Sequence, residues 1–126
     1  MFSVVIDNSP VIKVAAGKHE VSFGMDGSYM NPLEGFYATL AACAGVYAKK
    51  ACMELGIPAD GIEIGSKPFA ASGGALSLAK FRTEVRFPAH FTAEQKVLVL
   101  DVVAQCAVKK IVQVGNAIDF QVIESK

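Results

Sequence analysis

The spacing of hydrophobic and polar positions changes several times along this chain, and each change marks a predicted element. Three short runs rich in β-branched residues come first, separated by turn signals such as Asn8-Ser9-Pro10 and closed by Asp26-Gly27. They predict a small N-terminal meander, with strands at Val4–Ile6, Val11–Ala15 and His19–Phe23.

A long helix follows, and both of its ends carry recognisable signals. Asn31 is a predicted N-cap, Pro32 suits the first helical position, and Glu34 stands where a capping-box partner belongs. The helix should run to about Leu55 and stop at Gly56. Its side chains are almost all apolar or small before two lysines near its end, which predicts a helix buried on all sides. At roughly 36 Å it is long for so small a chain, so we expect a partner subunit to cover part of it.

The second half of the chain returns to strand periodicity. Two strands are predicted at Gly61–Ala70 and Ala75–Phe87, joined near Gly73-Gly74. The second strand alternates apolar and charged positions, which predicts one core face and one polar face. Pro68 marks the end of the first strand as an edge or a bulge.

A second long helix and a last strand complete the predicted layout. The helix begins at Thr92, which has Gln95 as its capping-box partner, and ends before Gly115, while the strand covers Ala117–Ile123. Strands, buried helix, hairpin, helix and strand, without a repeat or linker, predict one α+β domain over residues 1–126.

Composition adds an expectation about assembly and excludes several partners. The chain is 52% apolar and 19% charged, more apolar surface than a small monomer can hide, so an obligate oligomer is expected. Twelve basic residues balance twelve acidic ones and form no basic run, so nucleic acid is not an expected partner. The first residues lack a signal-peptide pattern, and no apolar stretch approaches about 20 residues, so we expect a cytoplasmic protein without a membrane partner.

The three cysteines are the candidate chemistry. Their odd number and the absence of a Cys-x-x-Cys pair argue against a disulfide scaffold, a zinc site and a thioredoxin-type motif. Cys43 and Cys52 lie on opposite faces of one helix, about 13 to 14 Å apart along its axis, so they cannot bridge each other. Cys106 on the second helix can reach only one of them, and Cys43, at mid-helix, is the better candidate. Cys52 is interpreted as core packing.

Other cofactor sites have little support. His19 and His90 have no ligand partner at metal spacing, so no metal is expected. Four glycines that could suggest a phosphate cradle are interpreted as turn residues: Gly24, Gly27, Gly73 and Gly74.

Two motifs together resemble the OsmC/Ohr family. They are Asn31-Pro32-x-Glu34 through Ala41-Ala42-Cys43 and, about sixty residues later, Cys106-Ala107-Val108-Lys109-Lys110. The resemblance covers approximately residues 18–123. It implies an α+β fold with an antiparallel sheet, two long central helices, an intertwined homodimer and an active site at the subunit interface.

The resemblance also implies a chemistry. In catalytic members the cysteine matching Cys43 is peroxidatic and the one matching Cys106 is resolving. A thiolate attacks an organic hydroperoxide, becomes a sulfenic acid and condenses with the second thiol to a disulfide. No cofactor is bound, and an external dithiol, of the lipoyl-protein type in the family, restores the thiols. Apolar walls such as Phe36, Leu40 and Val102 would favour fatty or aromatic hydroperoxides.

The chain departs from this family pattern at the groups that activate the thiolate. Catalytic members place an acidic residue ten positions before the first cysteine, where this chain has Leu33, and an arginine near the N-terminus, whereas no arginine precedes Arg82. Glu34 lies one residue later, where a capping role is expected. Candidate substitutes are Lys18, His19, Lys50, Arg82 and Arg86, with Lys109 and Lys110 as cations that could act on Cys106 and Tyr47 and Thr39 as neighbours of Cys43 on its helix face.

Three functional interpretations therefore stay open. The first is an organic hydroperoxide reductase that uses Cys43 and Cys106, with Glu34, Tyr47 and Arg82 as assisting candidates. The second is a non-catalytic relative that binds a small apolar ligand or acts as a slow redox switch, which the missing acid and arginine favour. The third is a purely structural dimerisation module.

Overall fold

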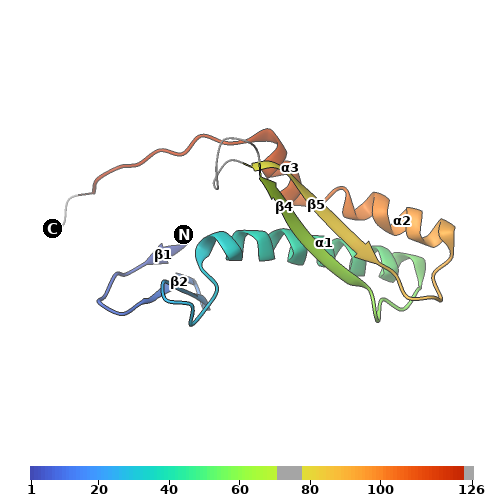
Figure 1. Cartoon of the computed structure of the whole chain (residues 1–126), viewed down its shortest axis with the longest axis horizontal. Coiled ribbons are helices and arrows are strands. Elements are labelled where there is room, and N and C mark those ends of the chain that lie inside the picture. The colour runs from blue at the N-terminus through green and yellow to red at the C-terminus, as the bar shows by residue number, and fades with distance from the viewer. Residues whose placement is uncertain (71–77, 124–126) are drawn as a thin grey trace. The chain divides into compact units, whose positions relative to one another are not determined.

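The computed structural model describes residues 1–70 and 78–123, and groups of strands are followed by helices along the chain (Figure 1). In chain order they are β1 (Ser3–Val4), β2 (Val11–Ala16), β3 (His19–Gly24), α1 (Pro32–Leu55), β4 (Glu63–Ala70), β5 (Leu78–Arg86), α2 (Ala93–Val103) and α3 (Ala107–Val114). The chain divides into two compact units. The first joins Met1–Ala42 to Glu63–Arg86, and the second joins Cys43–Ile62 to the chain from Phe87 onward. This is the mixed α+β composition that the sequence predicts, while the prediction of one domain over the whole chain stays a prediction.

The N-terminal meander of the first unit is confirmed. β1, β2 and β3 form an antiparallel sheet in that order, with Val14 opposite both Val4 and Val21. β1 is shorter than the predicted strand because its pairing with β2 ends at Val4. The ring of Phe23 then packs directly onto Gly35 of α1, so a side chain at that position would force the ring to move.

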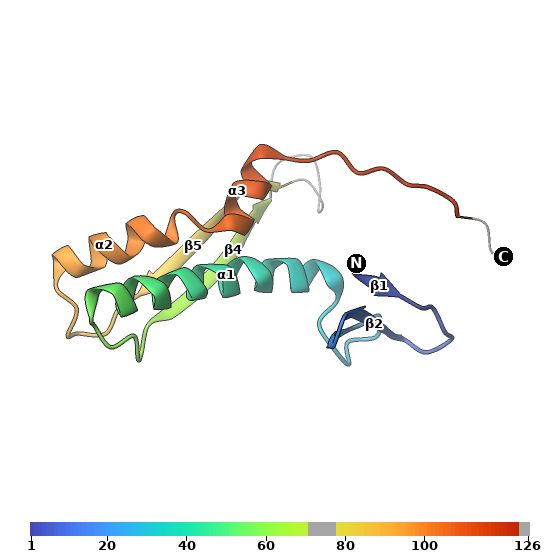
Figure 2. The same cartoon turned by 180° about the vertical axis from the view of Figure 1, so that it is seen from behind.

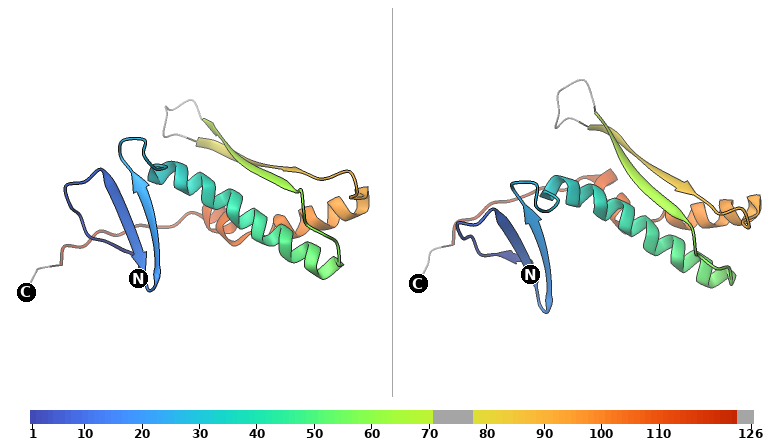
Figure 3. Two further views of the ribbon diagram at one scale, coloured as in Figure 1. Left: turned by 90° about the horizontal axis from the view of Figure 1, so that it is seen from below. Right: turned by 60° about the horizontal axis from the view of Figure 1, so that its bottom comes forward.

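The second sheet is an antiparallel hairpin of β4 and β5 (Figure 3). Ile64 lies opposite Val85 and Pro68 opposite Phe81, and all four side chains are half-buried. The register shifts between Phe69 and Ala70, so the predicted irregularity at the end of this strand is confirmed. The connection predicted near Gly73-Gly74, and the predicted start of the second strand at Ala75, lie outside the described residues.

Both ends of α1 follow the sequence signals. The Asn31 side chain accepts a hydrogen bond from the Glu34 amide at 2.8 Å, and the Glu34 carboxylate accepts one from the Asn31 amide at 3.0 Å. At the other end Gly56 has φ +67°, and the amides of Gly56 and Ile57 bond back to Met53 and Cys52. This reciprocal pattern is a Schellman motif, which satisfies the last carbonyls of the helix.

In the second unit α2 runs beside the second half of α1 (Figure 2). The predicted capping box of Thr92 and Gln95 is present, with both hydrogen bonds formed. Small side chains of α1 and branched side chains of α2 fill the buried interior of this unit. Its buried residues are Ala44, Ala48, Ala51, Cys52, Phe91, Val99, Val103 and Cys106.

The prediction of one continuous second long helix is wrong. α2 ends at Val103, and the backbone at Cys106 is extended, with φ −49° and ψ 129°, before α3 begins. The amides of Gln105 and Cys106 bond to the carbonyls three residues back, which tightens the end of α2. The Lys109 ammonium donates to the Ala104 carbonyl at 2.9 Å and so provides a partner where the helical ladder is interrupted.

The predicted strand at Ala117–Ile123 is also not formed. This segment pairs with no other described part of the chain, and Ile118, Phe120 and Val122 are 77%, 92% and 89% exposed. Its alternation of apolar and polar residues is typical of a strand, but a strand needs a hydrogen-bonding neighbour. The described part of the single chain does not supply one.

The surface of the chain carries many large apolar side chains. On α1 they include Val46 and Met53, which are 50% and 80% exposed, so α1 is not buried on all sides within one chain. Among the described residues, no helix is both long and apolar enough to cross a membrane.

Candidate thiol site

Cys43 lies in the middle of α1, at the first residue of the second unit, and its side chain is half-buried. The helix continues for twelve residues beyond it, so intact helical hydrogen bonds hold its backbone on both sides. A half-buried position leaves the sulfur accessible while the surrounding apolar residues limit its contact with water.

Cys106 lies at the break between α2 and α3 and is only 3% exposed. Because it is the N-cap of α3, the amides of the first turn of that helix follow it directly. The structure brings Cys106 to Cys43, and their side chains are hydrogen-bonded to each other. Two cysteines sixty-three positions apart therefore meet within one unit, as the sequence predicts for this pair.

The surroundings of Cys43 favour its thiolate. Burial raises the pKa of the Cys43 thiol, but the hydrogen bond from Cys106 and the amides of Val108 and Ala107 lower it, with a smaller contribution from the charge of Lys50. The donors together outweigh burial, and the pKa of Cys43 lies below the usual value of a thiol. A lowered thiol pKa provides more nucleophile at neutral pH.

Cys106 shows the opposite behaviour. Burial raises the pKa of its thiol, and the hydrogen bond that it donates to Cys43 raises it further, while the amides of Lys109 and Val108 oppose this only in part. Cys106 therefore keeps its proton when Cys43 has lost one. The pair combines a thiol with a lowered pKa and a thiol with a raised pKa, an arrangement suited to nucleophilic attack followed by disulfide formation.

Cys52 is separate from this pair. It is 1% exposed, and burial alone raises the pKa of its thiol. Its sulfur lies in the buried interior of the second unit, as the interpretation of core packing predicts. A neutral buried thiol of this kind is a poor nucleophile.

The helix face after Cys43 holds two of the predicted neighbours. Tyr47 is half-buried one turn later, and the Lys50 ammonium lies 5.2 Å from the centre of its ring. This cation–π contact holds the lysine on the Cys43 side of the helix. Lys50, one of the substitute cations predicted from the sequence, acts on the Cys43 thiol by its charge.

The other predicted assisting residues have different surroundings. The Glu34 carboxylate is engaged in the capping box of α1, as its position predicts. Arg82 lies opposite Lys67 in the hairpin register, and Arg86 forms an exposed ion pair with Glu63 at 3.6 Å. Thr39 donates its hydroxyl hydrogen to the Gly35 carbonyl, and Lys18 and His19 lie exposed at the turn between β2 and β3. Assisting roles for Glu34, Tyr47 and Arg82 stay predictions.

The backbone amides of Ala107 and Val108 are the functional groups that sequence reasoning missed. They reach Cys43 because α3 begins immediately after Cys106, and no glycine or proline near Cys106 signals that start. Lys109 was a candidate cation for Cys106, and its ammonium is bonded to the Ala104 carbonyl. Lys110, the next residue, is exposed.

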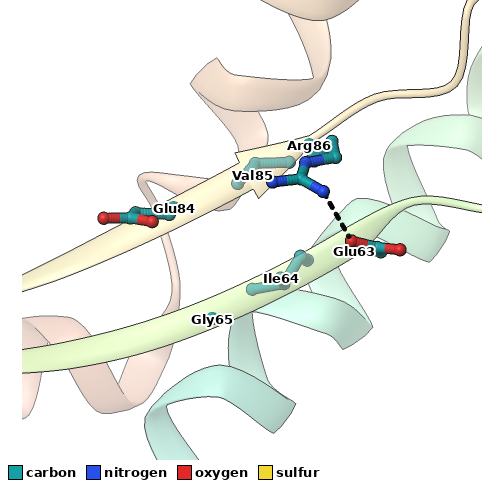
Figure 4. Close-up of a pocket in the computed structure, with 6 residues that line it drawn as sticks. All are labelled: Glu63, Ile64, Gly65, Glu84, Val85 and Arg86. Atoms are coloured by element: carbon teal, nitrogen blue, oxygen red, sulfur yellow. Dashed lines mark ion pairs between the residues drawn. The ribbon is translucent and has the colours of Figure 1, made fainter.

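A shallow hollow elsewhere on the molecule does not carry comparable chemistry. It lies on the hairpin and is lined by Glu63, Ile64, Gly65, Glu84, Val85 and Arg86 (Figure 4). Both partners of its ion pair, Glu63 and Arg86, are exposed, so the pair contributes little to stability. Within residues 1–70 and 78–123, no group of three or more histidine, cysteine or acidic side chains is placed to hold a metal ion.

Comparison with known proteins gives no match by sequence but clear matches by structure. No family model and no curated protein sequence matches the chain. A crystal structure of an OsmC-like protein from Mycoplasma pneumoniae superposes with a TM-score of 0.72 at 12% identity, covering 90% of this chain and 86% of the other. A protein from Psychrobacter arcticus, described as an osmotic stress induced and detoxification response protein, gives a TM-score of 0.71 at 12% identity, with coverages of 86% and 85%. The resemblance found in the two cysteine motifs is confirmed at the level of structure: this chain has the fold of OsmC-like proteins.

Proposed function

We propose that the protein is a thiol-dependent peroxidase that reduces organic hydroperoxides, with Cys43 as nucleophile and Cys106 as resolving thiol. The observation that carries the proposal is the contact between these two side chains, in which one thiol has a lowered pKa and the other a raised one. The fold supports it, since one structural neighbour is described as a detoxification response protein.

The proposed reaction has three steps. The Cys43 thiolate attacks the distal oxygen of the hydroperoxide, so an S–O bond forms as the O–O bond breaks, and the departing alkoxide takes a proton to become an alcohol. The Cys106 thiol then attacks the Cys43 sulfenic acid, and a disulfide forms with loss of water. An external dithiol, such as a lipoyl protein, returns both cysteines to thiols and is itself oxidised to a disulfide.

The surface of the chain supports a homodimer as the working form. Large apolar side chains are exposed on the meander, on the helices and on the unpaired segment after α3, more than a small monomer usually carries. In a dimer the alternating segment around Phe120 would gain a strand neighbour, and the exposed side of α1 would be covered.

A non-catalytic role is the second candidate. It is favoured by Leu33, which stands where catalytic family members have an acid and is 43% exposed. In that case the cysteine pair would serve as a slow redox switch, and apolar side chains would bind a small ligand.

The test is a count of free thiols after one equivalent of cumene hydroperoxide, with intact mass and peptide mapping. We expect the wild-type protein to lose two thiols rapidly as a Cys43–Cys106 disulfide. Cys52→Ser, the matched control from the same helix, should also lose two thiols, whereas Cys43→Ser should form no such disulfide. Three unreacted thiols in the wild type after long exposure would refute the peroxidase proposal and leave the non-catalytic role.

A further inference from the structure

The activation of Cys43 needs an explanation that the family pattern does not provide. Leu33 stands in the acidic position, and no arginine precedes Arg82. The Glu34 carboxylate, one residue from the acidic position, is bonded to the Asn31 amide. The groups that act on the thiolate must therefore come from elsewhere in the chain.

One short segment supplies three hydrogen-bond donors to the Cys43 sulfur. The Cys106 thiol and the amides of Ala107 and Val108 all approach it, and they belong to consecutive residues. These amides are among the first of α3, which have no carbonyl partner within their own helix, so a negatively charged sulfur is a suitable acceptor for them. The charge of Lys50 also lowers the pKa of Cys43, and its contribution is smaller than those of the three donors.

The segment is held in place by the helix break. The extended backbone at Cys106 turns the chain between α2 and α3, and the Lys109 ammonium bonds the Ala104 carbonyl across that turn at 2.9 Å. This bond spans the Cys106 position, because its partners lie on either side of it. A continuous helix would have bonded the amides of Ala107 and Val108 to its own carbonyls, and they could not have reached Cys43.

We propose that residues 106–108 have a second role, as a cradle of donors that activates Cys43 in place of the acid and arginine of the family, and that Lys109 positions this cradle. The inference rests on the proposed function, because it explains how Cys43 becomes the nucleophile. It gives Cys106 two successive tasks. As a thiol it stabilises the Cys43 thiolate, and after peroxide has reacted it closes the disulfide.

The first test compares Cys106→Ser with Cys106→Ala. Neither variant can form the disulfide, but serine keeps a donor beside Cys43 and alanine does not. The measurement is the rate of Cys43 alkylation by iodoacetamide between pH 5 and 10, followed by peptide mapping so that Cys52 is counted separately. We expect the alanine variant to react on the order of tenfold more slowly at pH 7, with its profile moved to higher pH, because a hydrogen bond to a charged group is lost. The serine variant should stay close to wild type, and identical profiles for the two variants would overturn the proposal.

The second test uses neighbouring lysines as a matched pair and does not change either cysteine. Lys109→Met removes the bond to Ala104, while Lys110→Met changes an exposed lysine one residue away. We expect the Cys43 profile to move to higher pH in the Lys109 variant alone. Equal profiles in the two lysine variants would show that Lys109 does not position the cradle. If Cys106→Ala does not fold, as judged by circular dichroism, the two lysine variants still test whether the cradle activates Cys43.

These measurements separate the inference from the proposed function. Alkylation requires no peroxide, so the pH profile of Cys43 reports the cradle alone. If the wild type reduces cumene hydroperoxide but no variant moves the profile, the cradle is refuted and the peroxidase stands. If the profiles move as expected but peroxide oxidises no thiol, the peroxidase is refuted and the activated thiolate remains.

Discussion

Cys43 and Cys52 lie on the same helix, nine residues apart, and the structure gives them opposite properties. Cys43 is half-buried beside the start of α3, and hydrogen-bond donors lower its pKa in spite of burial. Cys52 is fully buried, and burial alone raises its pKa. Each directly follows an alanine in the sequence, so neither the residue type nor the preceding residue separates them. The difference comes from what a distant part of the chain brings to each sulfur.

The comparison predicts a large difference in chemical reactivity. With iodoacetamide at pH 7, the folded protein should be alkylated at Cys43 long before Cys52. If exposing Cys52 requires a local opening that costs about 3 kcal/mol, its labelling is slowed roughly a hundredfold. Time-resolved peptide mapping measures both rates in one sample, and denatured protein provides the reference in which the two thiols react alike. Equal rates in the folded state would remove the distinction between the two regions.

The two positions should also differ in their effect on stability. Cys52→Ser places a hydroxyl in an apolar interior, and we expect the free energy of unfolding to fall by about 1–3 kcal/mol. Cys43→Ser, at a half-buried position near hydrogen-bonding groups, should cost less. Urea denaturation of both variants under reducing conditions measures this difference. A larger loss for Cys43→Ser would mean that the Cys43 region, and not the Cys52 region, is the more tightly packed.

How far these properties follow from sequence depends on whether they are local. The limits of α1 follow from Asn31, Glu34 and Gly56, because caps are made by residues close to the helix ends. The proximity of Cys43 to Cys106 was predictable in outline, since spacing excludes a Cys43–Cys52 bridge and the mid-helix position favours Cys43 over Cys52 as the neighbour of Cys106.

The helix break at Cys106 was not predictable in this way. The residues around it are ordinary helix formers, and the bond that accompanies the break runs from the Lys109 side chain to the Ala104 carbonyl. A side chain-to-backbone bond of this kind is not marked by residue type, so the sequence does not reveal it. The strand prediction around Phe120 was wrong for the reverse reason. The local pattern is typical of a strand, but strand formation requires a hydrogen-bonding neighbour.

The two thiols should respond in opposite directions to pH. Cys52 has a raised pKa in the folded state, so above about pH 8.5 the unfolded chain loses a proton that the folded chain keeps, and stability falls as pH rises. Cys52→Ala should not show this loss of stability between pH 7 and 9.5. Cys43 has a lowered pKa, so its contribution to stability is present at high pH and is lost as pH falls through the folded value. Urea denaturation at several pH values, for the wild type and both alanine variants, measures the two slopes, and slopes of the same sign would contradict the assignment.

The smallest expected effects concern the beginning of α1 and test whether its acidic residue belongs to the thiol site. Asn31→Ala removes the capping side chain that accepts a hydrogen bond from the Glu34 amide. We expect this to lower the free energy of unfolding by about 0.5–2 kcal/mol. Glu34→Gln keeps a capping-box side chain but removes its charge, so it should change stability by less than the alanine cap variant does. If Glu34 only caps the helix, both variants will leave the alkylation profile of Cys43 where it is in the wild type. A shift confined to Glu34→Gln would instead make the carboxylate part of the thiol site, and the contrast between Cys43 and Cys52 would then depend on charge from the start of α1 as well as on donors from α3.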